Sequence, residues 1–345
     1  MKLEIRTAWN IGAALLAATL AASGARAQTS QEWEQVVAAA KKEGVVRLYS
    51  GMSGTTALQA FVNAFREKYG IRVEALEVRA SELRERVRTE AVARRVLSDT
   101  MWTSAVQTRQ FAAEDRTIQP FGPVPNLKNV SQELREHWQN PDIHVPIFTV
   151  RYGILINSAA AKDAPKTYAD LLDPKWKGKI LADDFRAAGG GSTFFTVTYN
   201  NFGPDYLKRL EQNAVVFTRD QRGAERRVAR GEYIIYLPFS LNNYPQLTGL
   251  PVQALLLEEG MTYTPFSGSL IRNAPNPNAG RLFIDFMISD EGQAIFAAHG
   301  LGPMLAGLGD KAPPSLQPFA DKKFLGARDG TQDEFMFKAA KEIFK

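Results

Sequence analysis

The sequence contains no cysteine among its 345 residues and only three histidines. The lack of cysteine excludes disulfide bonds, thiol nucleophiles and thiolate metal ligands. No His-Glu-x-x-His pattern or close cluster of histidines and acidic residues occurs, and no histidine accompanies a Gly-x-Ser-x-Gly turn. The residues therefore favour neither metal-dependent catalysis nor a serine hydrolase, and we expect a protein that is not an enzyme.

Apolar runs long enough to cross a membrane are also missing. The main apolar run, 11–22, is shorter than the roughly 20 residues that a spanning helix needs. It follows the basic residues Lys2 and Arg6 and precedes the small-residue sequence 25–27. This order is typical of a secretory signal peptide over residues 1–27, cleaved before Gln28, with an uncleaved anchor as the alternative. Because no cysteine follows the cleavage point, a lipid anchor is excluded.

The charge excess is small, with 42 lysines and arginines against 37 acidic residues and a net charge of +5. Basic residues alternate with acidic ones, as in 82–86, which is typical of a solvated helix face. We therefore expect no nucleic-acid partner.

The mature chain is longer than chains that fold around a single hydrophobic core usually are, so we expect two lobes. Residues 45–49 have the pattern of a buried strand, 58–65 have helical apolar spacing, and 70–76 predict the next strand. This order predicts a β-α-β unit with a parallel strand pair, and hence an α/β fold.

Two loops rich in glycine and hydroxyl residues each lie between a strand and a helix. The first is 50–56, and the second, 185–192, follows a predicted strand at 180–182. Free amides at a helix start attract an anion, although an ordinary capped turn is the alternative. Strand ends in an open α/β sheet also face the ligand crevice, and Ser104 lies at the end of a short predicted strand at 99–104. The candidate ligand-binding residues here are Ser53, Gly54, Thr55, Ser104, Arg186, Gly190, Gly191 and Ser192.

The longest strand signal covers 144–157, and a second extended segment covers 262–271. Their length suggests that both cross between lobes. Arg151 and Tyr152 lie in the middle of the first of these segments. The alternative is that Arg151 lies at the surface and Tyr152 in the core.

Three segments carry a resemblance to a known family. They read DLLDPKWKGKI at 170–180, RRVARGE at 226–232 and LFIDFMISDEGQ at 282–293. These segments resemble ferric-binding-type periplasmic solute-binding proteins of bacterial ABC transporters, also called class II periplasmic binding proteins. The resemblance implies a two-lobed type II fold, in which each lobe has a central sheet flanked by helices and hinge strands join the lobes.

The resemblance also implies domain limits and partners. Lobe 1 is expected to contain 28–150 and about 263–310, and lobe 2 to contain 151–262, while 311–345 has no assigned lobe. The protein is expected to be a periplasmic monomer without a cofactor. Its lobes would close on a small-molecule ligand and then dock on an inner-membrane ABC permease. Arg151 and Tyr152 would lie at the edge of the cleft.

The loop after the predicted strand 233–237 is where ferric-binding members carry two adjacent tyrosines. This chain has Asn243-Tyr244-Pro245 there, so one tyrosine of the pair is missing. Ferric ion favours several anionic oxygens, and here Tyr244 and Tyr152 would have to supply them. We therefore expect a carboxylate or an organic phosphate as the ligand, with Asn243 and Tyr244 in the site. Ferric iron is the alternative, and a secreted hydrolase is the alternative from another class.

Overall fold

The computed structural model describes residues 31–52, 55–130, 142–305, 308–320 and 323–345. The predicted signal peptide, Ser53 and Gly54 lie outside the described residues, and so does 131–138, where the sequence predicts a helix. No helix in the described ranges is long and apolar enough to cross a membrane.

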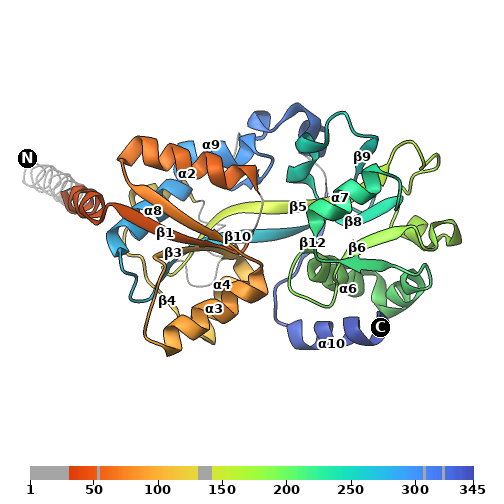
Figure 1. Ribbon diagram of the computed structural model, residues 1–345, viewed down its shortest axis with the longest axis horizontal. Helices are drawn as coiled ribbons and strands as arrows, with labels where there is room; N and C mark the ends of the chain where they lie inside the picture. Colours follow the sequence, from red (N-terminus) through yellow and green to blue (C-terminus); the bar gives the residue numbers. More distant parts are fainter. Residues whose placement is uncertain (1–30, 53–54, 131–141, 306–307, 321–322) are drawn as a thin grey trace, which may run out of the picture.

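The first lobe is built on a parallel β-α-β unit, which confirms the prediction for this part of the chain. Strand β1 pairs in parallel with β2 on one side and with β3 on the other. Helices cover both faces of this sheet (Figure 1). The elements of this lobe are a helix at 31–43, β1 (Val45–Ser50), α2 (Thr56–Tyr69), β2 (Arg72–Glu77), α3 (Ala80–Val92), β3 (Thr100–Ser104), α4 (Ala105–Ala113), β4 (Ile118–Gln119), η1 (Pro125–Asn129), α8 (Pro277–Met287), α9 (Asp290–Ala298) and β11 (Gly302–Pro303).

Two long antiparallel strands connect the lobes. Strand β5 (Val145–Asn157) has 13 residues and strand β10 (Met261–Ile271) has 11. Within one continuous sheet, β10 pairs with β3 of the first lobe, and β5 pairs with β8 of the second. Figure 1 shows both strands passing from one lobe to the other. The long strands predicted at 144–157 and 262–271 are therefore present.

The second lobe contains β6, which pairs in parallel with β7 and β8. The composition of 167–172 favours a helix, but the structure has two short 3-10 turns, because Pro174 stops the segment before a full α-helix forms. The sequence also predicts helices at 193–201 and 205–213, separated at 202–204. The structure confirms this break, because α6 is interrupted at Gly203, which has φ 79° and precedes Pro204. The elements are η2 (Ala169–Leu172), η3 (Pro174–Trp176), β6 (Ile180–Asp183), α6 (Gly190–Glu211), β7 (Val216–Thr218), α7 (Gln221–Ala229), β8 (Ile235–Ser240), η4 (Leu241–Leu247) and β9 (Val252–Leu255).

The C-terminal segment returns to both lobes. It contains η5 (Gly309–Lys311), η6 (Pro314–Phe319), β12 (Phe324–Ala327) and α10 (Asp333–Ile343). Strand β12 pairs with β10, and α10 packs on α6 of the second lobe. The domain limits given above remain a prediction.

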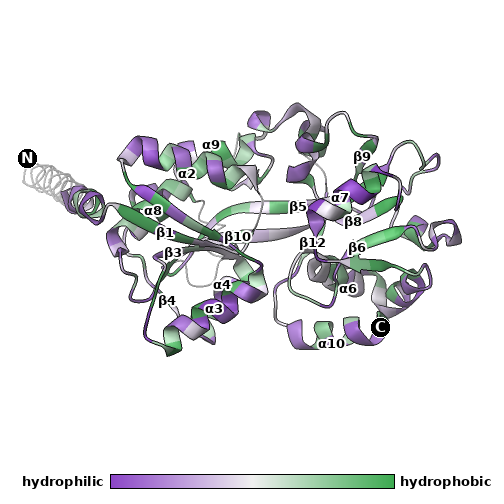
Figure 2. Ribbon diagram, viewed as in Figure 1, coloured by the Kyte–Doolittle hydropathy of each residue, from purple (hydrophilic) through white to green (hydrophobic). Residues whose placement is uncertain are grey.

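Each lobe has its own hydrophobic core. The larger core of the first lobe includes Phe61 and Trp102, both with no exposed surface. A core of the second lobe includes Phe185 and, from the C-terminal helix, Ala340. Figure 2 shows the hydrophobic residues along strands such as β5 and β6, whereas α3 is mainly hydrophilic. The hydrophobic strand residues thus contribute to the core of each lobe, and the polar helix faces meet solvent.

We expect Phe61→Ala to destabilise the first lobe strongly. Phe61 contacts the rings of Trp102, Phe283, Phe286 and Phe296. Removing it leaves a cavity, so the free energy of unfolding should fall by about 3–5 kcal/mol in urea titrations. Phe335→Ala is the control, because Phe335 is 54% exposed and should cost far less. Equal losses in the two variants would contradict the packing described here.

Candidate functional site

A cavity of about 660 Å³ lies between the two lobes. This volume is in the range of small-molecule sites. Its walls come from both lobes, from β5 and β10, and from the C-terminal segment. The residues that line it and carry the argument below are Thr55, Arg79, Ser81, Ser104, Gln107, Tyr152, Asp183, Gly189, Gly190, Thr193, Arg219, Arg222, Asn243, Thr264 and Arg328.

The floor of the cavity is a chain of hydroxyl groups on the crossing strands. The Tyr152 hydroxyl on β5 donates to Thr264 Oγ1 on β10 over 3.2 Å. Thr264 Oγ1 in turn lies 3.1 Å from Thr193 Oγ1 in the first turn of α6. Burial raises the pKa of Tyr152 to about 12, even though the bond to Thr264 opposes the shift. Tyr152 is therefore a neutral phenol at ordinary pH and a hydrogen-bond donor.

The wall from the first lobe consists of three helix starts. The side chain of Thr55 caps α2, and Ser104 Oγ accepts from the amide of Gln107 over 3.3 Å to cap α4. Helix α3 begins after Arg79 without a side-chain cap, so its first amides stay available. Three positive helix ends therefore face the cavity.

The wall from the second lobe begins at the end of β6. The carboxylate of Asp183 accepts from the amide of Gly191 over 2.9 Å, which fixes the start of α6. A Cβ at position 191 would lie 2.5 Å from the Asp183 carbonyl oxygen, so glycine is required there. A Cβ on Gly190 would lie 3.0 Å from the Tyr152 ring, so glycine lets this helix approach the floor closely.

The cavity has a mixed but arginine-rich lining. Five arginines line it, against four acidic side chains, and the acids include Asp183. Burial raises the pKa of Asp183 despite the Gly191 amide and the positive charge of Arg79. Arg219 Nη2 donates to Ser81 Oγ over 3.4 Å and so joins the second lobe to the first at the cavity. The arginines come from both walls, which suits an anion held between them.

Of the residues proposed from the sequence, the structure brings five together at this cavity. They are Thr55, Ser104, Tyr152, Gly190 and Asn243. Gly191 and Ser192 do not line it. Both residues instead stabilise the start of α6 behind the lining. The amide of Gly191 donates to Asp183, and Ser192 Oγ accepts from the amide of Gly189 over 3.1 Å.

Three proposed residues lie elsewhere. Arg186 pairs with Asp184 over 2.8 Å and stacks on Phe217, so it does not line the cavity. Arg151 alternates with Tyr152 along β5 and therefore points to the other face of the strand, where it donates to the Ala320 carbonyl over 3.5 Å.

Tyr244 is also absent from the cavity lining. Its ring contacts Phe239 and Phe319, each at 6.4 Å between ring centres. The two tyrosines proposed as iron ligands, Tyr152 and Tyr244, are therefore not brought together in the cavity. In the described part of the chain, no group of three or more histidine or acidic side chains is placed to hold a metal.

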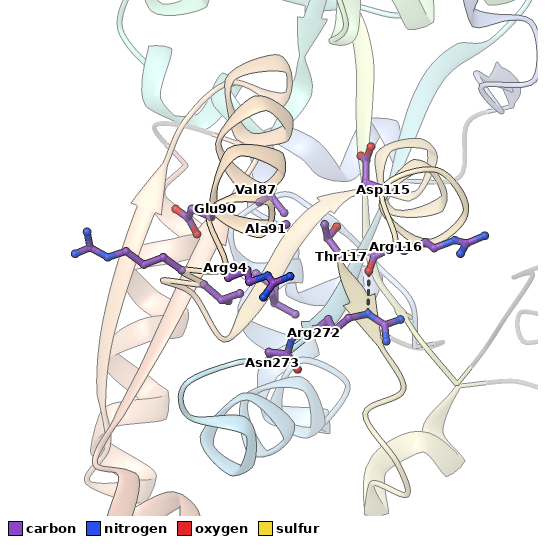
Figure 3. Close-up of a pocket in the computed structure, with 12 residues that line it drawn as sticks. Val87, Glu90, Ala91, Arg94, Asp115, Arg116, Thr117, Arg272 and Asn273 are labelled. Carbon is purple, nitrogen blue, oxygen red and sulfur yellow. Dashed lines mark hydrogen bonds between the residues drawn. The ribbon is translucent and has the colours of Figure 1, made fainter.

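A second hollow, of about 620 Å³, lies at the end of α3 in the first lobe. Figure 3 shows that Arg272 reaches the backbone of Arg116 there, and the Arg272 Nε–Arg116 O distance is 2.8 Å. All of its lining residues belong to one lobe. Because only the interlobe cavity is lined by residues of both lobes, we take it as the candidate site.

The sequence analysis missed the start of α3, the start of α7 and the segment after β12. Arg79 and Ser81 follow a strand that is mostly exposed, and Arg219 follows a strand of three residues. Both strands give weak sequence signals. In the sequence, Ser81 before the charged segment 82–86 predicts a helix cap, but α3 begins at Ala80 and its capping position is Arg79, which makes no side-chain cap bond.

Comparisons with known proteins place these features in context. Residues 46–302 match the family model described as bacterial extracellular solute-binding protein. Iron uptake protein A1 of Synechocystis sp. is 27% identical over 285 residues, which cover 76% of each chain.

Two solved structures share the fold. The Trichodesmium protein IdiA (FutA), in complex with iron and citrate, aligns with a TM-score of 0.68, 21% identity and coverage of 87% of this chain and 99% of its own. AfuA of Actinobacillus pleuropneumoniae, with fructose-6-phosphate bound, aligns with a TM-score of 0.67, 20% identity and coverage of 87% and 96%. The fold is therefore the type II periplasmic binding fold that the sequence predicts.

We expect Asp183→Asn to remove a pH-dependent cost of folding. Because the pKa of Asp183 is higher in the folded protein than its usual 3.8, the wild-type protein loses stability as the pH rises through the folded pKa. The variant should therefore gain stability relative to wild type as the pH rises above about 4. Urea unfolding at a series of pH values measures this difference.

Asp184→Asn is the matched control with the opposite sign. Although burial opposes the shift, hydrogen bonds from Arg186 lower the pKa of Asp184. The free energy of unfolding of the wild-type protein should therefore increase relative to that of this variant as the pH rises toward about 4. Above that pH the difference should stay constant. The same pH trend in both variants would contradict the environments described for the two carboxylates.

Proposed function

Because the chain belongs to the family of bacterial extracellular solute-binding proteins, we propose that it captures a small anionic solute, a carboxylate or an organic phosphate. The solute lies in the interlobe cavity and contacts both lobes when they close. The closed protein then delivers it to an ABC permease in the membrane.

The observation that carries this proposal is the convergence of five helix starts on one cavity. Residues at the starts of α2, α3, α4, α6 and α7 all line it. The positive end of each helix dipole favours an anion, and α3, which begins without a side-chain cap, also leaves its first amides available. Arginines from both walls add to this preference.

The relatives are compatible with this ligand class. The structure of AfuA holds fructose-6-phosphate, and that of the Trichodesmium protein holds iron together with citrate. A phosphate ester and a tricarboxylate are both small anions of the proposed kind.

Ferric iron remains a second candidate cargo, favoured by the oxygen donors Tyr152 and Asp183 at the cavity and by the names of the relatives. The position of Tyr244 outside the cavity weighs against it. An iron bound through citrate or a similar anion would need fewer protein ligands.

We further propose that the protein acts as a periplasmic monomer after cleavage at residue 27, and that it binds without turnover. The membership of the chain in a solute-binding family supports the last point.

The proposal predicts that particular anions stabilise the protein. A thermal-shift screen should compare citrate, inorganic phosphate, fructose-6-phosphate, glucose and ferric citrate. A bound anion at a hundred times its dissociation constant should stabilise by about 2.7 kcal/mol, whereas glucose should have no effect. A visible absorption band that appears only with ferric salts would favour iron, and stabilisation by glucose alone would contradict the anion proposal.

We expect Arg79→Gln to weaken the binding of a stabilising anion by about tenfold or more, because it removes a charge at the cavity. Arg186→Gln is the control, since Arg186 is paired with Asp184 outside the cavity. Isothermal titration with the same anion measures both. A larger loss in Arg186→Gln would place the ligand outside the interlobe cavity.

A further inference from the structure

The C-terminal segment contributes side chains to the cavity. Arg328, Asp333 and Phe337 all line it, and they lie 26 or more residues beyond the end of the family match at residue 302. Membership in the family therefore makes no statement about these three residues. They reach the cavity because β12 pairs with β10, which delivers the chain to the floor of the site.

The loop that follows β12 is held against the first lobe. Arg109 on α4 donates to the carbonyl of Asp329, and Gln110 on the same helix donates to Asp333 Oδ2 over 3.4 Å. A Cβ on Gly330 would lie 2.5 Å from Val106 Cγ1, so this loop approaches α4 as closely as glycine allows. Helix α10 then packs on α6 of the second lobe, and the segment thus spans both walls.

Arg328 is positioned at the centre of this arrangement. Its Nη1 donates to Asp333 Oδ1 over 2.9 Å, and its guanidinium lies 5.5 Å from the Phe337 ring centre. The side chain is only 9% exposed, although it lines the cavity. A guanidinium carries five N–H groups, and among the described residues Arg328 donates a hydrogen bond only to Asp333.

Resting on the proposed function, we propose that Arg328 is a specificity-determining residue of this site, whose guanidinium binds the carboxylate or phosphate group of the solute. Its rigid fork matches two oxygens of such a group, and its low exposure makes the pairing stronger than it would be in water. Phe337 and Asp333 hold the fork in place before the solute arrives. The starts of the helices then bind the remainder of the anion.

Asp333 is a positioning residue in this arrangement. Its carboxylate accepts from Arg328 on one oxygen and from Gln110 of the first lobe on the other. It therefore ties the guanidinium to the wall formed by α4. The acid also limits the net positive charge near Arg328, so its carboxylate opposes a dianion or trianion more than a monoanion.

The test compares wild type, Arg328→Gln, Arg328→Lys and Asp333→Asn by isothermal titration with citrate and with fructose-6-phosphate. We expect Arg328→Gln to weaken binding of the anion by about tenfold to a hundredfold. Arg328→Lys should recover part of the affinity, because it restores the charge without the fork. The dependence of affinity on salt concentration should also become shallower in Arg328→Gln.

Acetate, as a monoanion, and Asp333→Asn complete the design. The loss in Arg328→Gln should be smaller for acetate than for citrate. Asp333→Asn should increase the preference for citrate over acetate, because it removes a negative charge beside the guanidinium. A purely structural Arg328 would give Arg328→Gln a lower melting temperature and an unchanged dissociation constant, which would overturn this inference. Wild-type protein that binds none of these anions would overturn the proposed function, and this inference with it.

Discussion

The hydrogen-bonded pairing of β5 with β10 is the constraint on which the rest of the structure depends. The two strands pair antiparallel along most of their length, from Thr262 opposite Tyr152 to Gly268 opposite Val145. Each strand continues into the sheet of one lobe, so the lobes cannot separate without breaking a central ladder. The floor of the cavity is therefore fixed, while the walls built by helix starts are the parts that can move toward each other.

The chemistry of the site follows from where strands end. Strands β1, β2, β3, β6 and β7 finish at the cavity, and the helix that follows each of them begins with residues that line it. The proposed anion binding would thus rest on the arrangement of the helix starts, and side chains would refine it. Tyr152 and Asp183 add polar groups whose pKa values are both raised mainly by burial. With a neutral phenol, five arginines and four acidic side chains, the lining is mixed, and the arginines outnumber the acids.

The sequence was sufficient to predict the parts of this arrangement that have local signals. Hydrophobic strands of 13 and 11 residues and the glycine-rich start of α6 follow from periodicity and turn chemistry. The position of the Arg186 side chain does not follow from such local signals. The conformation of its loop determines whether the guanidinium reaches the cavity or pairs with Asp184, and here it pairs with Asp184. Arg328 was beyond prediction for another reason: its place depends on the pairing of β12 with β10, two segments about 60 residues apart in the chain.

The central claim is that backbone amides at helix starts hold the solute. Hydrogen–deuterium exchange of the protein with and without citrate measures these amides directly. The account predicts that citrate slows exchange at the starts of α2, α3, α4, α6 and α7, on both sides of the cavity at once. Slowed exchange confined to the hollow at the end of α3, around Arg272 and Asn273, would contradict it.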